Sequence, residues 1–173
     1  MSADEIFEIV DRSGRIIGHA PRSEAHGNPE LIHRSVHVLV LDIEKKTGEQ
    51  RIFLQKRSAD KDIQPGKWDT SVGGHVAPGE SVLEAAKREM SEELGIAGVD
   101  FQLLYSYIWR SEVETELVTS YLCYYKGPMR ILRSEIDEGR LWSFAEIERM
   151  LGSGTLTPNF EEEFSRLKKY LDG

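Results

Sequence analysis

The strongest structural signal in this chain is the segment Gly74-His75-Val76-Ala77-Pro78-Gly79-Glu80, continued after seven residues by Arg88-Glu89-Met90-Ser91-Glu92-Glu93-Leu94-Gly95-Ile96. Between the two parts, Ser81 has the side chain of a helix N-cap, and Glu84 stands three residues later, which is the spacing of a capping box. Gly95 suits the position just after a helix end. We therefore predict a helix that runs from Ser81 to about Leu94.

Three carboxylates share one face of this predicted helix. Glu89, Glu92 and Glu93 stand at i, i+3 and i+4, so they fall within a sector of roughly 100°. Like charges at this spacing destabilise an isolated helix by about a few tenths of a kcal/mol. Hard oxygen donors gathered this closely suit Mg²⁺ or Mn²⁺. The alternative interpretation, usual for such a pattern taken alone, is an acidic helix face in solvent.

The residues around the carboxylates support the metal interpretation. The guanidinium of Arg88 is suited to a bidentate contact with a carboxylate, either Glu80 or Glu92. Gly74 and Gly79 let the preceding loop fold tightly, which would bring a backbone carbonyl near Gly74 to the metal.

The spacing of the segment resembles the signature of the Nudix (MutT-type) hydrolases at each fixed position. These positions are Gly74, Glu80, Arg88, Glu89, Met90, Glu92, Glu93, Gly95 and Ile96. The resemblance implies hydrolysis of a diphosphate linkage in a nucleoside diphosphate derivative or a related diphosphate. It implies Glu89, Glu92 and Glu93 as metal ligands, with Glu92, Glu93 or a glutamate of a later loop taking a proton from the attacking water.

The elements predicted on either side of the motif form one α/β (α+β) domain over residues 1–173, with a mixed sheet covered on both faces. The resemblance implies a Nudix-type α/β/α sandwich with its Nudix box at 74–96. The order of elements is strands, helix, strands and two helices. The predicted elements are a hairpin at about 6–20, strands at 36–43, 51–55, 101–109, 116–126 and 140–143, and helices at 81–94, 144–151 and 160–171.

A second set of candidate ligands lies outside the carboxylate helix. His26 and His33 are seven residues apart, His75 is placed in the loop before the helix, and Glu114 and Glu116 alternate at the start of a strand. Taken singly, a histidine is more often structural than a metal ligand. Taken together, the five residues suit a second metal site for Mn²⁺ or Zn²⁺.

The same five residues look like the metal ligands of the type I isopentenyl diphosphate isomerases, a branch of the Nudix superfamily. In that family, basic residues at the positions of Arg57, Lys61 and Arg22 hold the diphosphate, and the alternative here is ordinary surface charge. The likeness extends to Arg57-Ser58-Ala59-Asp60-Lys61, Pro65-Gly66-Lys67-Trp68 and Ser71-Val72-Gly73-Gly74-His75.

Two departures favour hydrolase over isomerase chemistry. The isomerases place a cysteine where this chain has Gly73, and glycine has no side chain to move a proton. Cys123 lies in a predicted strand and is expected to be a small buried apolar residue. The isomerases also commonly carry a basic residue at the position of Glu89. We therefore predict a Nudix hydrolase of the isomerase-like subgroup. The alternatives are an isomerase and a non-catalytic metal- or nucleotide-binding module.

The composition and net charge limit the kinds of partner that the protein is expected to bind. With 39% hydrophobic and 30% charged residues, the 173-residue chain has a globular composition, and it lacks an apolar run long enough for a membrane span. A net charge of −8 argues against nucleic acid polymers and anionic membranes, but metal can neutralise a small diphosphate substrate. The single Cys123 excludes an internal disulfide and a cysteine zinc cluster. We expect a cytoplasmic protein, and a homodimer is compatible with the sequence.

Overall fold

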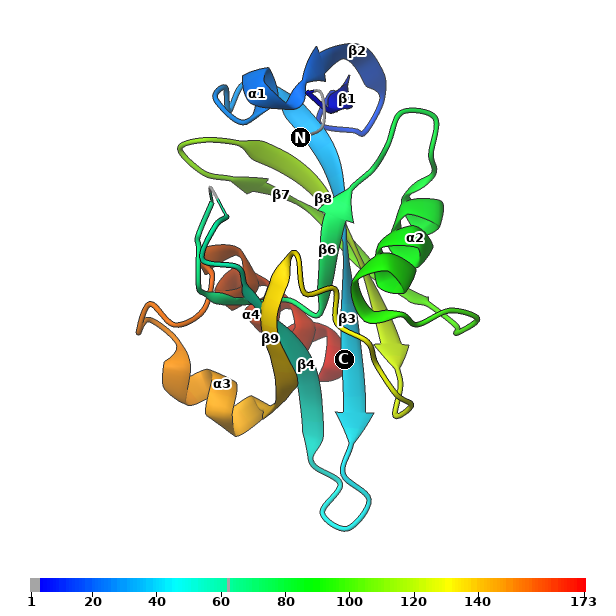
Figure 1. The fold of residues 1–173 in the computed structure, drawn as a ribbon, viewed down its shortest axis with the longest axis vertical. Coiled ribbons are helices and arrows are strands. Elements are labelled where there is room, and N and C mark those ends of the chain that lie inside the picture. The colour runs from blue at the N-terminus through cyan, green and yellow to red at the C-terminus, as the bar shows by residue number, and fades with distance from the viewer. Residues whose placement is uncertain (1–3, 62) are drawn as a thin grey trace.

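A computed structural model describes residues 4–61 and 63–173 of the chain. It contains nine strands and four helices (Figure 1). In chain order they are β1 (Ile6–Val10), β2 (Ile16–Pro21), α1 (Arg22–Ala25), β3 (Ile32–Ile43), β4 (Gln50–Arg57), β5 (Trp68–Asp69), β6 (Val72–His75), α2 (Val82–Leu94), β7 (Gln102–Arg110), β8 (Thr115–Tyr124), β9 (Ile136–Ser143), α3 (Phe144–Met150) and α4 (Pro158–Leu171).

The sheet is organised around the long strand β3. It pairs antiparallel with β1, β4 and β6 along different parts of its length, and parallel with β8. The β8 strand continues the sheet to β7, and β4 continues it to β5 and β9. The result is the predicted mixed sheet, in which β3 is covered by strands on both edges.

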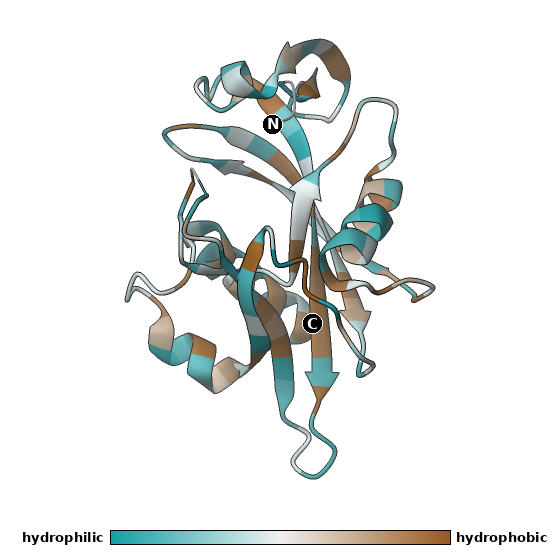
Figure 2. Ribbon diagram, viewed as in Figure 1, coloured by the Kyte–Doolittle hydropathy of each residue, from teal (hydrophilic) through white to brown (hydrophobic). Residues whose placement is uncertain are grey.

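Helices pack against both faces of the sheet, with α2 on one side and α3 and α4 on the other (Figure 1). Val36, Val38 and Val40 of β3 belong to the apolar cluster that includes the buried residues of α2. Leu39 and Leu41, which point the other way, pack with the buried residues of α4. This double burial explains why the middle of β3 is apolar at successive positions (Figure 2).

The helix that carries the motif is bounded as the sequence predicts. The Ser81 side chain accepts a hydrogen bond from the Glu84 backbone, and the Glu84 carboxylate accepts one from the Ser81 N–H at 2.9 Å. Gly95 closes the helix with φ of 67°, a left-handed conformation that glycine adopts without a steric penalty.

The structure corrects the sequence-based description near the site and adds short elements. The strand predicted at 36–43 begins at Ile32 and therefore includes His33. His75 was expected in a loop, but it is the last residue of β6 and pairs with Ser35 of β3. The elements α1, β5 and β6 were not predicted, because each has only two to four residues and carries no clear periodicity. Across the described residues, no helix has both the length and the apolar character needed to cross a membrane.

Candidate active site

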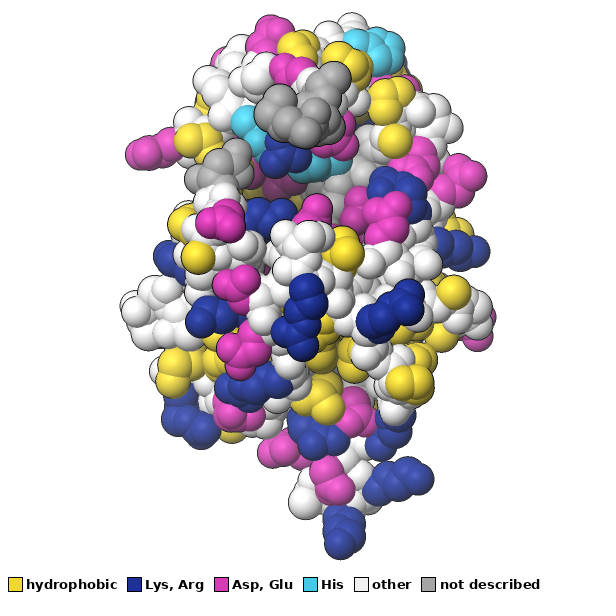
Figure 3. All heavy atoms as spheres, viewed as in Figure 1, with side chains coloured by type: hydrophobic (Ala, Val, Ile, Leu, Met, Phe, Trp, Pro, Cys, Tyr) yellow, Lys and Arg dark blue, Asp and Glu magenta, His cyan; other side chains and the backbone are white. Residues whose placement is uncertain are grey.

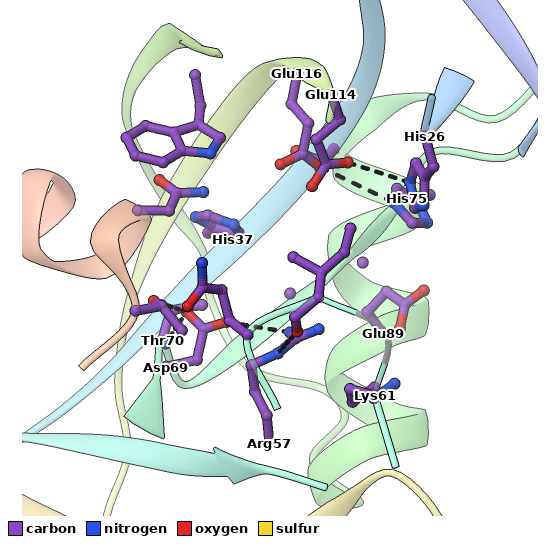
Figure 4. Close-up of a pocket in the computed structure, with 18 of the residues that line it drawn as sticks. His26, His37, Arg57, Lys61, Asp69, Thr70, His75, Glu89, Glu114 and Glu116 are labelled. Atoms are coloured by element: carbon purple, nitrogen blue, oxygen red, sulfur yellow. Dashed lines mark hydrogen bonds and ion pairs between the residues drawn. The ribbon is translucent and has the colours of Figure 1, made fainter. Parts of the chain in front are cut away.

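A cavity of about 820 Å³ opens beside β3 and receives side chains from most of the elements around it. Its lining includes the carboxylates of α2, four residues of the second predicted set (His26, His75, Glu114 and Glu116), and several basic residues. On the face shown in Figure 3, acidic, basic and histidine side chains gather together in the upper half of the molecule. Figure 4 shows how the labelled side chains converge.

The three helix carboxylates lie along the cavity in different environments. Glu93 is only 5% exposed and accepts a hydrogen bond from the Gln55 side chain at 2.8 Å. Glu89 is also largely covered and accepts one from Arg88 at 2.8 Å. Glu92 is more than half exposed and lies 3.5 Å from Arg88. The helix therefore turns two of its three carboxylates inward, which a purely solvated acidic face would not do.

Inward placement is unfavourable for these carboxylates without a cation. Burial raises the pKa of Glu89, although the neighbouring Arg88 guanidinium opposes the shift. Burial raises the pKa of Glu93 well above its usual value, and the charge of Glu89 raises it further although Gln55 opposes the shift. A divalent ion between the two carboxylates would favour their charged forms, so the donor set fits Mg²⁺ or Mn²⁺.

Arg88 connects helix α2 to the first part of the motif through hydrogen bonds. Its guanidinium donates to both carboxylate oxygens of Glu80, at 2.8 and 2.9 Å, and to the carbonyl oxygen of His75 at 3.0 Å. Of the two bidentate partners considered from sequence, the structure selects Glu80. The pKa of Glu80 is lowered, first by this hydrogen bonding, so the pair stays charged.

Gly74 is required by the close approach of Glu89. A Cβ atom at position 74 would overlap the Glu89 carboxylate. The backbone at Gly74 therefore lies directly against a predicted metal ligand, as the sequence-based prediction of a nearby carbonyl ligand requires.

Four residues of the second predicted set, His26, His75, Glu114 and Glu116, come together at one end of the cavity (Figure 4). The parallel register pairs His33 of β3 with Glu116 of β8, and β6 delivers His75 from the other side of β3. The Nε2 atom of His26 lies 3.1 Å from Glu114 Oε1, and that of His33 lies 3.5 Å from the same oxygen. Glu116 Oε2 lies 3.7 Å from His33 Nε2 and 4.0 Å from His75 Nε2.

This cluster has the donor chemistry of a transition-metal site. One ligand atom from each of His26, His33, His75 and Glu114 lies within 4.8 Å of all the others. Within the described part of the chain, both ring nitrogens of His26 and His33 and one oxygen of Glu114 are buried without a hydrogen-bond partner. Buried polar atoms are rarely left unpaired, so their convergence fits an ion such as Mn²⁺ or Zn²⁺.

The close packing of these histidines and glutamates also shifts their pKa values. Burial lowers the pKa of His33, but the nearby carboxylates of Glu114 and Glu116 raise it overall to about 9. Burial and the charge of His33 hold the pKa of His75 well below its usual value. Burial raises the pKa of Glu114, but the partners His26 and His33 lower it overall. A metal ion would take the place of the proton on His33.

The basic residues predicted to hold a diphosphate, Arg57, Lys61 and Arg22, all line the cavity. Arg57 also donates to the backbone carbonyl of Ile63 at 2.9 Å, which fixes its direction. Each basic residue has an acidic partner: the pairs are Arg57–Asp69 at 3.3 Å, Lys61–Glu135 at 3.8 Å and Arg22–Glu5 at 3.4 Å.

Sequence reasoning missed several cavity residues. Asp69 accepts a hydrogen bond from Thr157, the N-cap of α4, at 3.0 Å and so links that helix to the site. Glu135 and His37 also line the cavity. A signal for His37 was present, because it follows His33 by four residues on the same strand face. The contributions of Asp69 and Glu135 depend on long-range packing.

The comparison with protein families decides the classification. A NUDIX domain model matches residues 31–166, which is most of the chain. The protein belongs to the Nudix hydrolase family. The Nudix box predicted at 74–96 lies within the matched residues and contains the carboxylate helix, whose carboxylates line the cavity.

Nudix relatives match over most of the chain. An uncharacterised Nudix hydrolase of Streptomyces coelicolor is 34% identical over 98% of this chain and 91% of its own length. Another from Yersinia pestis is 36% identical over 78% of this chain and 70% of its own. An isopentenyl-diphosphate Delta-isomerase of Nocardia farcinica is 43% identical, over 52% of this chain and 49% of its own. The isomerase-like relationship predicted from sequence is thereby confirmed.

Solved structures support the Nudix fold. A protein of Deinococcus radiodurans superimposes with a TM-score of 0.79 at 21% identity, covering 94% of this chain and 98% of its own. The Nudix domain of NrtR from Shewanella oneidensis, solved with ADP ribose, gives a TM-score of 0.66 at 15% identity, covering 87% and 98%. At these identities the likeness concerns the fold alone.

Proposed function

We propose that this protein is a metal-dependent pyrophosphohydrolase that cleaves a diphosphate linkage in a nucleoside diphosphate derivative or a related diphosphate. The observation that carries the proposal is the pair of inward-facing carboxylates, Glu89 and Glu93, beside a cavity that also holds basic side chains. Carboxylates of this kind bind a hard cation, and the cation together with basic residues accommodates an anionic substrate in an acidic protein.

In this proposal, each of the site residues has a distinct role. Glu89, Glu92, Glu93 and the carbonyl of Gly74 would hold Mg²⁺ or Mn²⁺. When bound, such an ion stabilises charge on the phosphate oxygens and makes a nearby water more acidic. Arg88 ties the end of β6, at His75, to the helix. A cavity carboxylate accepts the water's proton, and the candidates include Glu92, Glu93 and Glu135.

The histidine cluster would hold a second metal ion, Mn²⁺ or Zn²⁺, through His26, His33, His75, Glu114 and Glu116. Its convergent, unpaired donor atoms support this assignment. Since residues of both donor sets line one cavity, a diphosphate bound there would be close to both metal sites. Arg57, Lys61 and Arg22 would then bind phosphate oxygens, exchanging their present carboxylate partners for the substrate.

Isopentenyl diphosphate isomerisation is the second candidate, because one relative at 43% identity carries that name. Two features of the cavity weigh against it. Gly73 presents no side chain at the position where the isomerases place their cysteine. Cys123, at 1% exposure, is buried in the apolar cluster under α2, as the sequence predicted, and does not line the cavity. A third candidate is a binding module without turnover.

A substrate panel with Mg²⁺ or Mn²⁺ separates the three candidates. The panel comprises ADP-ribose, NADH, dinucleoside polyphosphates, damaged nucleoside triphosphates, coenzyme A and isoprenoid diphosphates. We expect metal-dependent cleavage at a diphosphate linkage in at least one compound. Deuterium uptake into isopentenyl diphosphate without cleavage would instead identify an isomerase. Ligand-induced stabilisation without turnover of any compound would identify a binding module.

A further inference from the structure

A buried acid–base pair closes the side of the cavity opposite α2. Nδ1 of His37, on β3, lies 2.6 Å from Oε1 of Glu163, on α4. The Glu163 side chain is completely buried, whereas the His37 ring belongs to the cavity lining. None of the roles assigned above uses either residue. A buried carboxylate is costly unless it is well paired, so this arrangement calls for an explanation.

Glu163 is held by more than the imidazole. The hydroxyl of Ser120, on β8, donates to Oε2, and so does that of Tyr105, on β7, at 3.2 Å. The hydroxyl of Tyr107 lies 3.4 Å from Oε1 while it donates to Asn159 at 2.8 Å. With these donors around both oxygens, the carboxylate is fixed in position and accepts the Nδ1–H of His37.

The second ring nitrogen of His37 is turned toward the strand that carries Gly73. His37 pairs with Gly73 across β3 and β6. A Cβ built at Gly73 would lie 3.3 Å from Cδ2 and 3.7 Å from Nε2 of the His37 ring. Because residue 73 is glycine, no side chain fills this space. The open Nε2 edge is therefore available to a molecule in the cavity.

We propose that His37 is a substrate-contacting residue, which donates a charge-assisted hydrogen bond from Nε2 to an anionic oxygen of the bound diphosphate, and that Glu163 is the positioning residue that holds its ring. The inference rests on the proposed function, because it requires a diphosphate in this cavity. It gives that substrate a cationic contact on the side of the cavity away from the α2 carboxylates (Figure 4).

The charge state of the ring supports this role. Burial alone would lower the pKa of His37, but Glu163 raises it to about 9. The other acidic groups that act on the ring are Asp69 of β5 and Glu116 of β8. Burial raises the pKa of Glu163, but the charge of His37 and the surrounding hydrogen bonds lower it overall. The pair is therefore ionic at neutral pH, with both ring nitrogens protonated.

Binding of imidodiphosphate, a diphosphate analogue with a nitrogen bridge, tests the contact directly by calorimetry in the presence of Mg²⁺. We expect His37→Gln to weaken binding by about tenfold or more, the usual cost of losing a charge-assisted hydrogen bond. The matched control is His19→Gln, at an exposed histidine of β2 outside the cavity lining, which should bind as the parent does. Binding by His37→Gln within twofold of the parent would overturn the inference.

The role of Glu163 is tested by Glu163→Gln, with the ring nitrogens followed by NMR and assigned by their loss in His37→Gln. We expect the His37 titration midpoint to fall by more than one pH unit. The affinity of Glu163→Gln for imidodiphosphate, relative to that of the parent at the same pH, should then weaken as the pH rises through that lower midpoint. A parent-like pH profile of affinity in Glu163→Gln would show that the pair only ties α4 to the sheet.

These outcomes separate the inference from the proposed function. If the parent itself does not bind imidodiphosphate, both are contradicted. If the parent binds it and His37→Gln binds equally well, only the role of His37 fails. A thermal unfolding scan of each variant checks that the altered binding does not come from loss of the fold.

Discussion

Individual carboxylates on α2 carry the proposed chemistry, and the prediction for them concerns turnover. Glu92→Gln or Glu93→Gln should each lower kcat by several orders of magnitude, because each removes a metal charge or the proton acceptor while keeping the side-chain shape. The measurement is steady-state hydrolysis of whichever panel compound is cleaved. A fall of less than tenfold in both variants would remove these residues from the mechanism.

Gly74 offers a prediction from packing alone. Gly74→Ala should displace the Glu89 carboxylate, since the added Cβ would overlap it, and should weaken Mg²⁺ or Mn²⁺ binding by about tenfold or more. The control is Gly18→Ala, because a Cβ at Gly18 meets no atom within 4 Å. Calorimetry measures the metal affinity of both variants. Equal affinities in the two variants would show that Glu89 is not a ligand.

At the residue scale, the sequence predicted which side chains meet but not their exposure. The set His26, His33, His75, Glu114 and Glu116 could be assembled from a family resemblance, and the structure brings it together. The buried Glu93, by contrast, is hydrogen-bonded to Gln55, a residue on a strand distant in sequence. Neither helical periodicity nor motif spacing contains that information.

The helix α2 carries the carboxylates of the site. The contribution of its N-cap to the stability of the protein can be tested. Ser81→Ala should destabilise the protein by about 1 kcal/mol, because it removes the side-chain acceptor of the N-cap. Ser91→Ala, at an exposed position of the same helix, is the control and should change stability by less than half as much. Urea unfolding measures both. Equal losses would argue against the capping box.

The strands β3, β6 and β8 position His33, His75 and Glu116 of the histidine cluster, and the protonation of this cluster predicts a pH dependence. The raised pKa of His33, about 9, means that the ring holds its proton below that pH. A metal ligand must release that proton, so Mn²⁺ affinity at this site should rise as the pH increases from about 7 to 9, by up to about tenfold per unit.

The variant His75→Ala provides the comparison for this pH dependence. It should alter the response to Mn²⁺ or Zn²⁺ more than the response to Mg²⁺, because imidazole suits the former ions. Metal titrations of activity and of thermal stability measure the difference. Identical metal profiles in parent and variant would rule out the second site.

Elements with a strong periodic pattern were predictable, and short ones were not. The boundaries of α2 follow from Ser81 and Gly95, whose side-chain and backbone properties act locally. The two-residue β5 and four-residue β6 exist because β4 and β3 supply their hydrogen-bond partners. That partnership is a property of the folded sheet, which explains why His75 was assigned to a loop.

For the whole molecule, the predicted layers follow from one strand that is apolar on both faces. The apolar run from Val38 to Leu41 requires cover on two sides, and α2 and α4 provide it. The sequence did not predict that α4 would also contribute Glu163, the buried partner of the cavity residue His37. Glu163 lies next to Phe164, among the buried positions in the amphipathic pattern of α4. Its partners His37, Tyr105 and Ser120, which come from three other elements, explain why a charged residue is buried there.

The central claim, that α2 and the histidine cluster hold cations on two sides of one cavity, is tested most directly by anomalous diffraction from crystals soaked in Mn²⁺. The account predicts one peak bounded by Glu89 and Glu93 and a second among His26, His33 and Glu114. An acidic face of α2 that stays empty and directed into bulk solvent at saturating Mn²⁺ would contradict it.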